Sequence, residues 1–167
     1  RMAVITNGGG PGVMAIDAMD RYGVVPAALR GETIAALDQN LPTFWSRRNP
    51  VDILGSADAD RYTRVVEIIS KDPGLDSLMI IMAPQAITPP VEVAEALINI
   101  LKDLSFPVFA VWMGGRDMAP AVQLFNDAGI ATYPAPERAV LAFSYMVQHT
   151  RNLALIKEIP PRLERRL

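Results

Sequence analysis

The sequence contains no cysteine and a single histidine, His149. The lack of cysteine excludes disulfides, thiolate nucleophiles and cysteine-ligated metals, and no residue spacing suggests a metal site. His149 lies late in the last predicted helix, far from the polar loops described below, so we expect a surface or packing role for it. No serine lies beside a candidate base either. We therefore expect no catalytic residue and no metal ligand in this chain.

Long apolar runs and clusters of one charge are also absent. No run approaches the roughly 20 apolar residues that span a bilayer, and no segment has the pattern of a signal peptide. The net charge is −2, without a basic stripe, so we expect neither nucleic acid nor a membrane as a partner. The lack of cysteine fits a cytoplasmic location, which we expect for this protein.

What is present suits one domain of ordinary size. The chain has 167 residues, of which 50% are hydrophobic and 20% charged, which is enough for a well-filled core. It opens on Arg1 and runs into a predicted strand at the next residue, so we expect it to be part of a longer protein. We place the domain at residues 1–157 and expect a polar tail or linker at residues 158–167.

Predicted strands and helices alternate along the chain. Apolar runs predict strands at Met2–Thr6, Val24–Leu29, Ser77–Met82, Pro107–Trp112 and Ile130–Tyr133. Helical spacing predicts helices at Pro11–Tyr22, Glu32–Asn40, Asp58–Lys71, Pro90–Leu104, Asp117–Ala128 and Pro136–Leu155, the last with a break near His149 left open. Such alternation favours an α/β fold, a parallel sheet with helices on both faces. Right-handed crossovers then favour a flavodoxin-like three-layer sandwich with five strands in the order 2-1-3-4-5.

A glycine-rich loop follows the first predicted strand. It consists of Asn7, Gly8, Gly9, Gly10, Pro11 and Gly12. Glycines allow positive φ and let a ligand approach closely, and the free N–H groups and dipole of the following helix favour an anion. No acidic residue occurs before Asp17. The loop therefore predicts a site for a phosphate-like anion, and a tight turn without a ligand is the alternative.

The familiar nucleotide-binding motifs do not match this loop. Val13 follows Gly12, where a P-loop has lysine and where the dinucleotide fingerprint needs its third glycine. Arg30 stands in the region where the fingerprint has an acid. Thr6 is the one hydroxyl nearby, whereas a flavin mononucleotide loop wants several, and the acidic pair of a receiver domain is missing.

Other unusual residues lie on loops that a parallel sheet brings to the same edge. The supporting candidates are Asn49, Asp52, Gln85, Gly114, Gly115 and Arg116. Asp52 could orient a loop or a neighbouring imidazole, or cap a turn or the helix starting near Asp58. Arg116 could clamp a carboxylate or a phosphate, or be a solvated arginine. For Trp45 and Trp112 we expect packing roles.

Several of these motifs together resemble a known family. The run Val4–Val13, Asn49–Asp52, Pro84–Gln85, Trp112–Gly115 and Pro136–Val140 occur in the order found in NDP-forming acyl-CoA synthetases, and Asp17, Asp72 and Asp76 fit the same pattern. The likeness covers roughly residues 2–157. The chain resembles their flavodoxin-like ligase domain, which corresponds to the C-terminal domain of the succinyl-CoA synthetase β subunit.

The resemblance implies a role in forming acyl-CoA, ADP and phosphate from acid, CoA and ATP. A histidine on a neighbouring domain carries the phosphoryl group in that family, and two helix N-termini face it. One of them would be the start of the helix at Pro11–Tyr22. The implied partners are CoA-binding, phosphohistidine and ATP-grasp domains. CoA, ATP/ADP and Mg²⁺ would bind there, with no cofactor in this domain, and the domain alone would be inactive. The chain resembles equally an acyl-CoA-sensing domain of a protein lysine acetyltransferase, and this is the alternative function.

Overall fold

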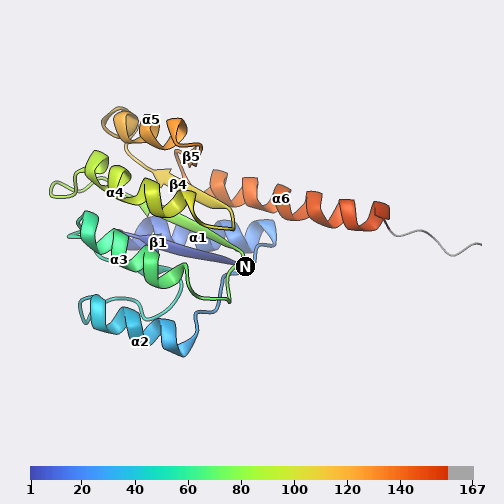
Figure 1. The fold of residues 1–167 in the computed structure, drawn as a ribbon, viewed down its shortest axis with the longest axis horizontal. Coiled ribbons are helices and arrows are strands. Elements are labelled where there is room, and N and C mark those ends of the chain that lie inside the picture. Colours follow the sequence, from blue (N-terminus) through green and yellow to red (C-terminus); the bar gives the residue numbers. More distant parts are fainter. Residues whose placement is uncertain (158–167) are drawn as a thin grey trace, which may run out of the picture.

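The computed structural model describes residues 1–157, so the predicted tail at 158–167 lies outside the described residues. It contains a five-stranded, all-parallel sheet in the order β2-β1-β3-β4-β5. The strands are β1 (Met2–Thr6), β2 (Val51–Asp52), β3 (Ser77–Met82), β4 (Val108–Trp112) and β5 (Ala131–Tyr133) (Figure 1). The predicted α/β class and strand order are confirmed.

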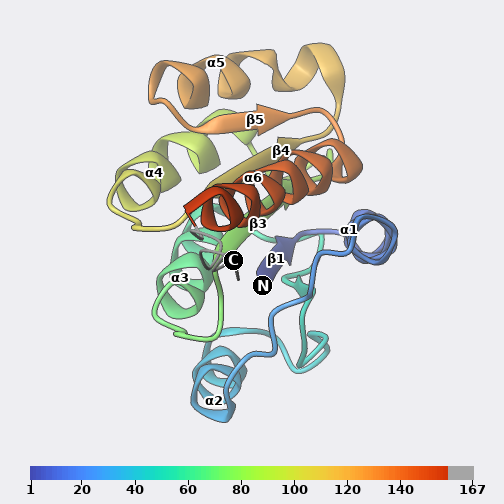
Figure 2. The ribbon, with the colours of Figure 1, turned by 90° about the vertical axis from the view of Figure 1, so that its right-hand side faces the viewer.

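Helices cover both faces of the sheet, as Figure 2 shows from the end of the strands. Helices α1 (Gly9–Tyr22) and α6 (Pro136–Lys157) pack on one face. The other face is covered by α2 (Gly31–Asn40), α3 (Ala59–Ile69), α4 (Pro90–Lys102) and α5 (Ala119–Asp127), with the short 3₁₀ helix η1 (Gly115–Met118) before α5. Within residues 1–157, no helix is long and apolar enough to cross a membrane.

The central strands are buried on both sides. Along β3, the side chains of Leu78 and Ile80 join the core under α2 to α5, whereas Met79 and Ile81 join the core under α1 and α6. Alternate side chains of a strand point to opposite faces, so a strand covered on both sides needs apolar residues throughout. This explains why β3 shows no polar alternation.

Helix α6 differs from its prediction because it is continuous. It runs unbroken past His149 and its second half projects beyond the sheet (Figure 1). His149 is exposed on that projecting part. The site predicted at the other end of the strands is therefore remote from this histidine.

The predicted strand at Val24–Leu29 is wrong. This segment makes a single parallel bridge, between Pro26 and Met2, and Val25 is 62% exposed. Proline has no N–H to extend a strand ladder, which confines it to sheet edges. The second strand is instead β2, which pairs with the last two residues of β1, Ile5 and Thr6. The edge position beside β1 is thus shared by two separate pieces of chain.

The side chain of Asn49 joins these two pieces. Its Oδ1 accepts the Val4 N–H at 2.8 Å, and its Nδ2 donates to the carbonyls of Met2 and Ala27 at 2.9 and 3.1 Å. A side-chain amide carries both a donor and an acceptor, as a peptide group does. Asn49 therefore supplies hydrogen bonds that a continuous edge strand would have made.

Candidate functional site

The loops at the carboxyl ends of the strands form one connected surface, as predicted. The Thr88 hydroxyl, after β3, donates to the Ala57 carbonyl, after β2, at 2.8 Å. A Cβ added at Gly55 would lie 3.1 Å from Gln85 Oε1, and one added at Gly114 would lie 2.9 Å from Pro84 Cγ. The loops after β2, β3 and β4 thus contact one another and form a continuous face.

The start of α1 leaves backbone donors free. Gly8 is the N-cap, and its own N–H donates to Thr6 Oγ1 at 3.1 Å. Pro11 has no N–H, and the Gly12 N–H donates to the Gly8 carbonyl at 3.3 Å. No partner within the described residues accepts from the N–H groups of Gly9 and Gly10. These two groups are available to an outside acceptor.

The glycines of this loop do not provide the positive φ that the sequence suggested. None of them adopts a positive φ, and the helix begins at Gly9 rather than at Pro11. A Cβ at Gly12 would lie 3.1 Å from Thr6 Cγ2, so this glycine allows α1 to pack closely on β1. A Cβ at Gly10 would meet nothing within 4 Å. Packing within the domain therefore does not require a glycine at position 10. The lack of a side chain there keeps the space above the helix start open.

Electrostatics set α1 apart from the other helices that directly follow strands. Asp58 caps α3, Glu92 lies in the first turn of α4, Asp117 in that of η1 and Glu137 in that of α6. Acidic side chains at these positions offset the positive end of the helix dipole. Helix α1 has no acid in its first turn and no side-chain cap. Its own residues thus leave its N-terminus uncompensated, whereas α5, which also lacks an acid in its first turn, is preceded by Asp117 of η1.

Asn7 closes the crevice between β1 and β3. Its side chain is 1% exposed, donates to the Ala83 carbonyl at 3.0 Å and accepts the Ala83 N–H at 2.8 Å. This crevice lies at the switch point of the strand order, where open α/β sheets usually take their ligands. Because the Asn7 amide fills it, the open space lies above the first turn of α1 instead.

Asp52 lies at the start of α1. It pairs in register with Thr6, its Oδ1 accepts the Leu54 N–H at 2.9 Å, and its Oδ2 would lie 3.5 Å from a Cβ on Gly9. Leu54 has a positive φ of 69°, which Asp52 helps to hold. The capping residue of α3 is Asp58, whose Oδ1 accepts the Arg61 N–H. Asp52 thus stabilises its own turn and keeps one oxygen toward the helix start.

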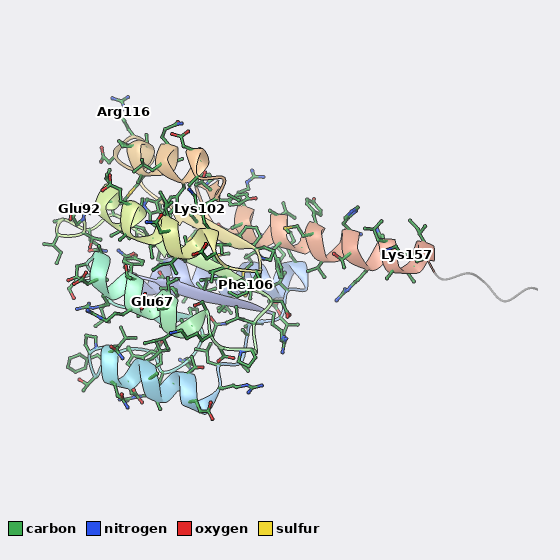
Figure 3. The ribbon with its side chains drawn as sticks, in the orientation of Figure 1. Glu67, Glu92, Lys102, Phe106, Arg116 and Lys157 are labelled. Atoms are coloured by element: carbon green, nitrogen blue, oxygen red, sulfur yellow. The ribbon has the colours of Figure 1, made fainter. Side chains whose placement is uncertain are left out.

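The remaining supporting candidates lie elsewhere on the edge. Gln85 is exposed beside Gly55. Gly114 and Gly115 have φ values of 134° and 59°, so they shape the turn after β4. Arg116 is exposed, and Figure 3 shows its side chain pointing away from the domain. Two strand spacings, about 10 Å, separate β4 from β1, so the structure does not bring Gly114, Gly115 and Arg116 to the start of α1.

A cavity of about 510 Å³ lies beside α1 and contains residues that the sequence reasoning missed. Gly9 and Asp52 line it together with Ser46 and Arg48. The Ser46 hydroxyl donates to the Pro50 carbonyl at 2.6 Å and accepts the Asp52 N–H at 3.2 Å, so it holds this wall in place. Arg48 adds an exposed cation. Its position just before Asn49 was the available signal in the sequence.

A larger hollow, of about 920 Å³, lies at the opposite edge of the sheet under the projecting half of α6. Tyr22, Pro107 and Leu155 are among its lining residues. None of the predicted site residues lines it. In residues 1–157 no group of three or more histidine or acidic side chains could hold a metal ion. The predicted anion-binding residues therefore lie at the carboxyl edge of the sheet and not at this hollow.

Comparison with known proteins identifies the family of the chain. The family model of the Ligase-CoA domain matches residues 2–157. The chain is 36% identical, over 90% of its length, to the ADP-forming acetate–CoA ligase I of Archaeoglobus fulgidus, and 35% identical, over 92%, to the α subunit of the ADP-forming acetate–CoA ligase II of Pyrococcus furiosus. It spans 21% and 34% of those two proteins, respectively.

A solved structure matches over nearly the whole domain. The dinucleotide-forming acetyl-coenzyme A synthetase 1 of Ca. Korarchaeum cryptofilum, in complex with phosphate and ADP, superimposes with a TM-score of 0.88 at 33% identity. The match covers 97% of this chain and 36% of that one. The same arrangement of strands and helices is thus one domain within a longer chain.

Proposed function

Since the chain belongs to the Ligase-CoA domain family, we propose that it is a domain of an NDP-forming acyl-CoA synthetase, which converts acid, CoA and ATP to acyl-CoA, ADP and phosphate. Its similarity to ADP-forming acetate–CoA ligases supports this activity. The acyl-CoA-sensing domain of a lysine acetyltransferase is the alternative, and the relatives described above, all ligases, favour the synthetase.

Within this enzyme, the start of α1 receives the phosphoryl group of a phosphohistidine that another domain carries. The observation that carries this proposal is the helix start itself: two free N–H groups, no acid in the first turn and open space at Gly10. Such a helix start stabilises a phosphate without a charged side chain. The histidine comes from elsewhere, because His149 is remote.

The cofactors of the reaction belong to the other domains in this proposal. The residues described here include no cluster of carboxylates or histidines for Mg²⁺. The glycine loop also lacks the lysine of a P-loop. By the family resemblance, CoA and ATP with its Mg²⁺ would bind to CoA-binding and ATP-grasp domains, and this domain would contribute the phosphoryl-facing helix.

The test is Gly10→Glu in the full-length enzyme. The new carboxylate lies in open space and interacts favourably with the helix dipole, so the free energy of unfolding should stay equal or rise by about 0.3–1 kcal/mol. The same charge repels a phosphoryl group, so transfer of labelled phosphate from ATP to the carrier histidine should fall by at least about 100-fold. Autoradiography of acid-labile phosphoprotein measures this.

Gly31→Glu is the matched control. Gly31 is also the first-turn glycine of a helix and also has open space around it, but α2 begins at the opposite edge of the sheet. Phosphorylation of the histidine should be unchanged in this variant. Normal phosphorylation in folded Gly10→Glu enzyme would overturn the proposed role of α1.

A further inference from the structure

The projecting half of α6 has no cover within the described residues. Every residue from Gln148 to Lys157 is exposed, and Figure 3 shows Lys157 at the far end of the helix, away from the sheet. Packing of an apolar face supplies most of the stability of helices in proteins. This stretch also contains His149, Thr150 and Asn152, which are weak helix formers. A covering surface would supply the stabilisation that the stretch itself lacks.

Large apolar side chains gather on this projecting half and around the hollow beneath it. Four of them on α6 are between 43% and 79% exposed: Met146, Leu153, Leu155 and Ile156. Leu155 also lines the hollow of about 920 Å³, and the exposed Val25 forms part of the opposite wall. Met146 is shared with a second hollow, of about 390 Å³, which extends to Phe106. Exposed apolar side chains that are gathered in this way, rather than scattered singly, mark an interaction surface.

The charge of this surface is positive. From residue 139 onward, α6 contains Arg151 and Lys157 and no acidic residue. The two salt bridges within residues 1–157 involve neither of them, and Asp76, the acid that lines the hollow, is bonded to Arg1. Lys157 lies in the last turn, where a cation offsets the helix dipole, but Arg151 lies too early for that. A partner that covers Arg151 must bring a carboxylate, because an unpaired buried charge is costly.

This charge decides between two kinds of partner. In a symmetric dimer the same surface patch faces itself, so α6 packed on α6 would bring like charges together, which is unfavourable. The other source of a partner surface is the remainder of a longer enzyme. The matched domain makes up 36% of the chain of the solved structure, so most of such a chain lies outside it. A second copy of this domain is therefore the poorer fit.

We propose that the projecting half of α6, with the hollow beneath it, is the docking surface for another domain of the same polypeptide, which presents an apolar ridge bordered by aspartate or glutamate side chains. Met146 and Leu155 contact the ridge, and Arg151 pairs with a carboxylate. This inference rests on the proposal that the chain is one domain of a larger enzyme. It does not use the role proposed for α1, which begins at the opposite edge of the sheet.

Arg151→Lys in the full-length enzyme tests the charge pairing. The variant keeps the positive charge and supplies an amine, which a carbodiimide joins to a carboxylate only where the two are in contact. Peptide mass mapping should find position 151 joined to an aspartate or glutamate outside residues 1–167. Lys71, which is exposed but does not line the hollow, should not be joined to that peptide. Cross-links of position 151 confined to residues 1–167, in the same or in a second copy, or none at all, would overturn the inference.

Leu155→Glu tests the apolar contact. Leu155 is exposed within the domain, and leucine and glutamate have similar helix propensities, so the domain itself should be unaffected. The glutamate loses the contact with the ridge and repels the partner's carboxylates. Hydrogen exchange of the amides of residues 148–157 in the full-length enzyme should therefore quicken roughly 10-fold or more. Ile87→Glu, at a similarly exposed position on the loop after β3, should leave this exchange unchanged. Equal exchange in wild type and Leu155→Glu would show that no other domain covers α6.

The docking surface and the phosphoryl role can fail separately. Gly10→Glu combined with Arg151→Lys should lose phosphorylation of the carrier histidine and keep the cross-link from position 151. Loss of the cross-link would count against the docking surface, whereas normal phosphorylation would count against the role of α1.

Discussion

At the scale of single residues, the side chains of two asparagines make hydrogen bonds that main-chain groups make elsewhere in the sheet. Asn7 extends the pairing of β1 with β3 beyond their ends, and Asn49 fills the gap in the edge strand. Both side chains are engaged in hydrogen bonds with main-chain groups. The anion site proposed above is built from backbone N–H groups at the start of α1, and the side chain of Asp52 lies beside them.

Asn49→Ala should lower the free energy of unfolding by about 2–4 kcal/mol, because it leaves the Val4 N–H and the carbonyls of Met2 and Ala27 without this partner. Urea denaturation followed by circular dichroism measures the change. Asn40→Ala is the comparison, since Asn40 is exposed and bonds only to Ala36 of its own helix. Equal effects of the two substitutions would show that Asn49 does not hold the edge together.

At the scale of elements, α1 and α2 make a contrasting pair. Both begin with glycine, and neither has a side-chain cap of its own. The start of α2 nevertheless has a carboxylate from another part of the chain as its hydrogen-bond acceptor. Asp72 accepts the Arg30 N–H at 2.9 Å and the Thr33 hydroxyl at 2.7 Å. Within residues 1–157, no carboxylate bonds to the start of α1. The two helix starts therefore differ in whether a side chain of the domain accepts hydrogen bonds there.

Asp72 should make stability depend on pH. Burial alone would raise its pKa, but hydrogen bonds from Arg30, Thr33 and Gly74 outweigh burial and hold the pKa below its usual value. Its contribution is therefore complete above the unfolded pKa of about 3.9 and is lost as pH falls through the lower folded value. Urea unfolding from pH 7 to pH 2 should show this loss.

Asp72→Asn provides the control for that titration. At pH 7 it should be less stable than wild type by about 1–3 kcal/mol, because the amide group cannot accept all three donors. The deficit should shrink below the folded pKa, where the wild-type carboxyl is protonated too. A constant deficit at every pH would contradict the assigned role of the ionised carboxylate.

The glycines of α1 should respond differently to alanine. Gly10→Ala places its methyl group in open space and should gain about 0.5 kcal/mol from reduced chain entropy. Gly12→Ala pushes against Thr6 and Pro50 and should be less stable than Gly10→Ala by about 1–2 kcal/mol. Thermal unfolding of both variants measures the difference. Equal stability would mean that α1 does not depend on close packing over β1.

At the scale of the whole molecule, the domain has a core on each face of its sheet. Trp45 and Trp112 are buried in the larger core, at 4% and 2% exposure, as expected for packing residues. Trp112 packs edge-on against Phe125 at a centroid distance of 4.6 Å. Both faces of the sheet are thus covered by helices within residues 1–157.

The isolated domain should therefore fold cooperatively while being inactive. Urea transitions followed by tryptophan fluorescence and by circular dichroism should coincide, with a free energy of unfolding of about 5–15 kcal/mol. Mixed with ATP, CoA and acetate, the domain should form no acyl-CoA, since the carrier histidine and nucleotide sites are proposed to lie elsewhere. Turnover by the isolated domain would contradict that assignment.

Most of the architecture and the place of the candidate site could be predicted from local patterns in the amino-acid sequence. Strands β1, β3 and β4 were predictable because burial on both faces leaves an unbroken apolar run. The helices were predictable from their periodicity, within two residues at each end. The glycine loop could be placed at the carboxyl edge because parallel strands bring all their following loops there.

How that site is built could not be predicted in this way, because the contacts that form it join residues far apart in the chain. Asn7 meets Ala83 across 76 positions, and Asn49 meets Val4 across 45. The edge strand at residues 51–52 was too short to produce a pattern. The position of α1 over β1 and β2 decides three further features: Gly12 allows close packing, Gly10 faces open space, and Asp52 lies beside Gly9. No local pattern in the sequence expresses that position.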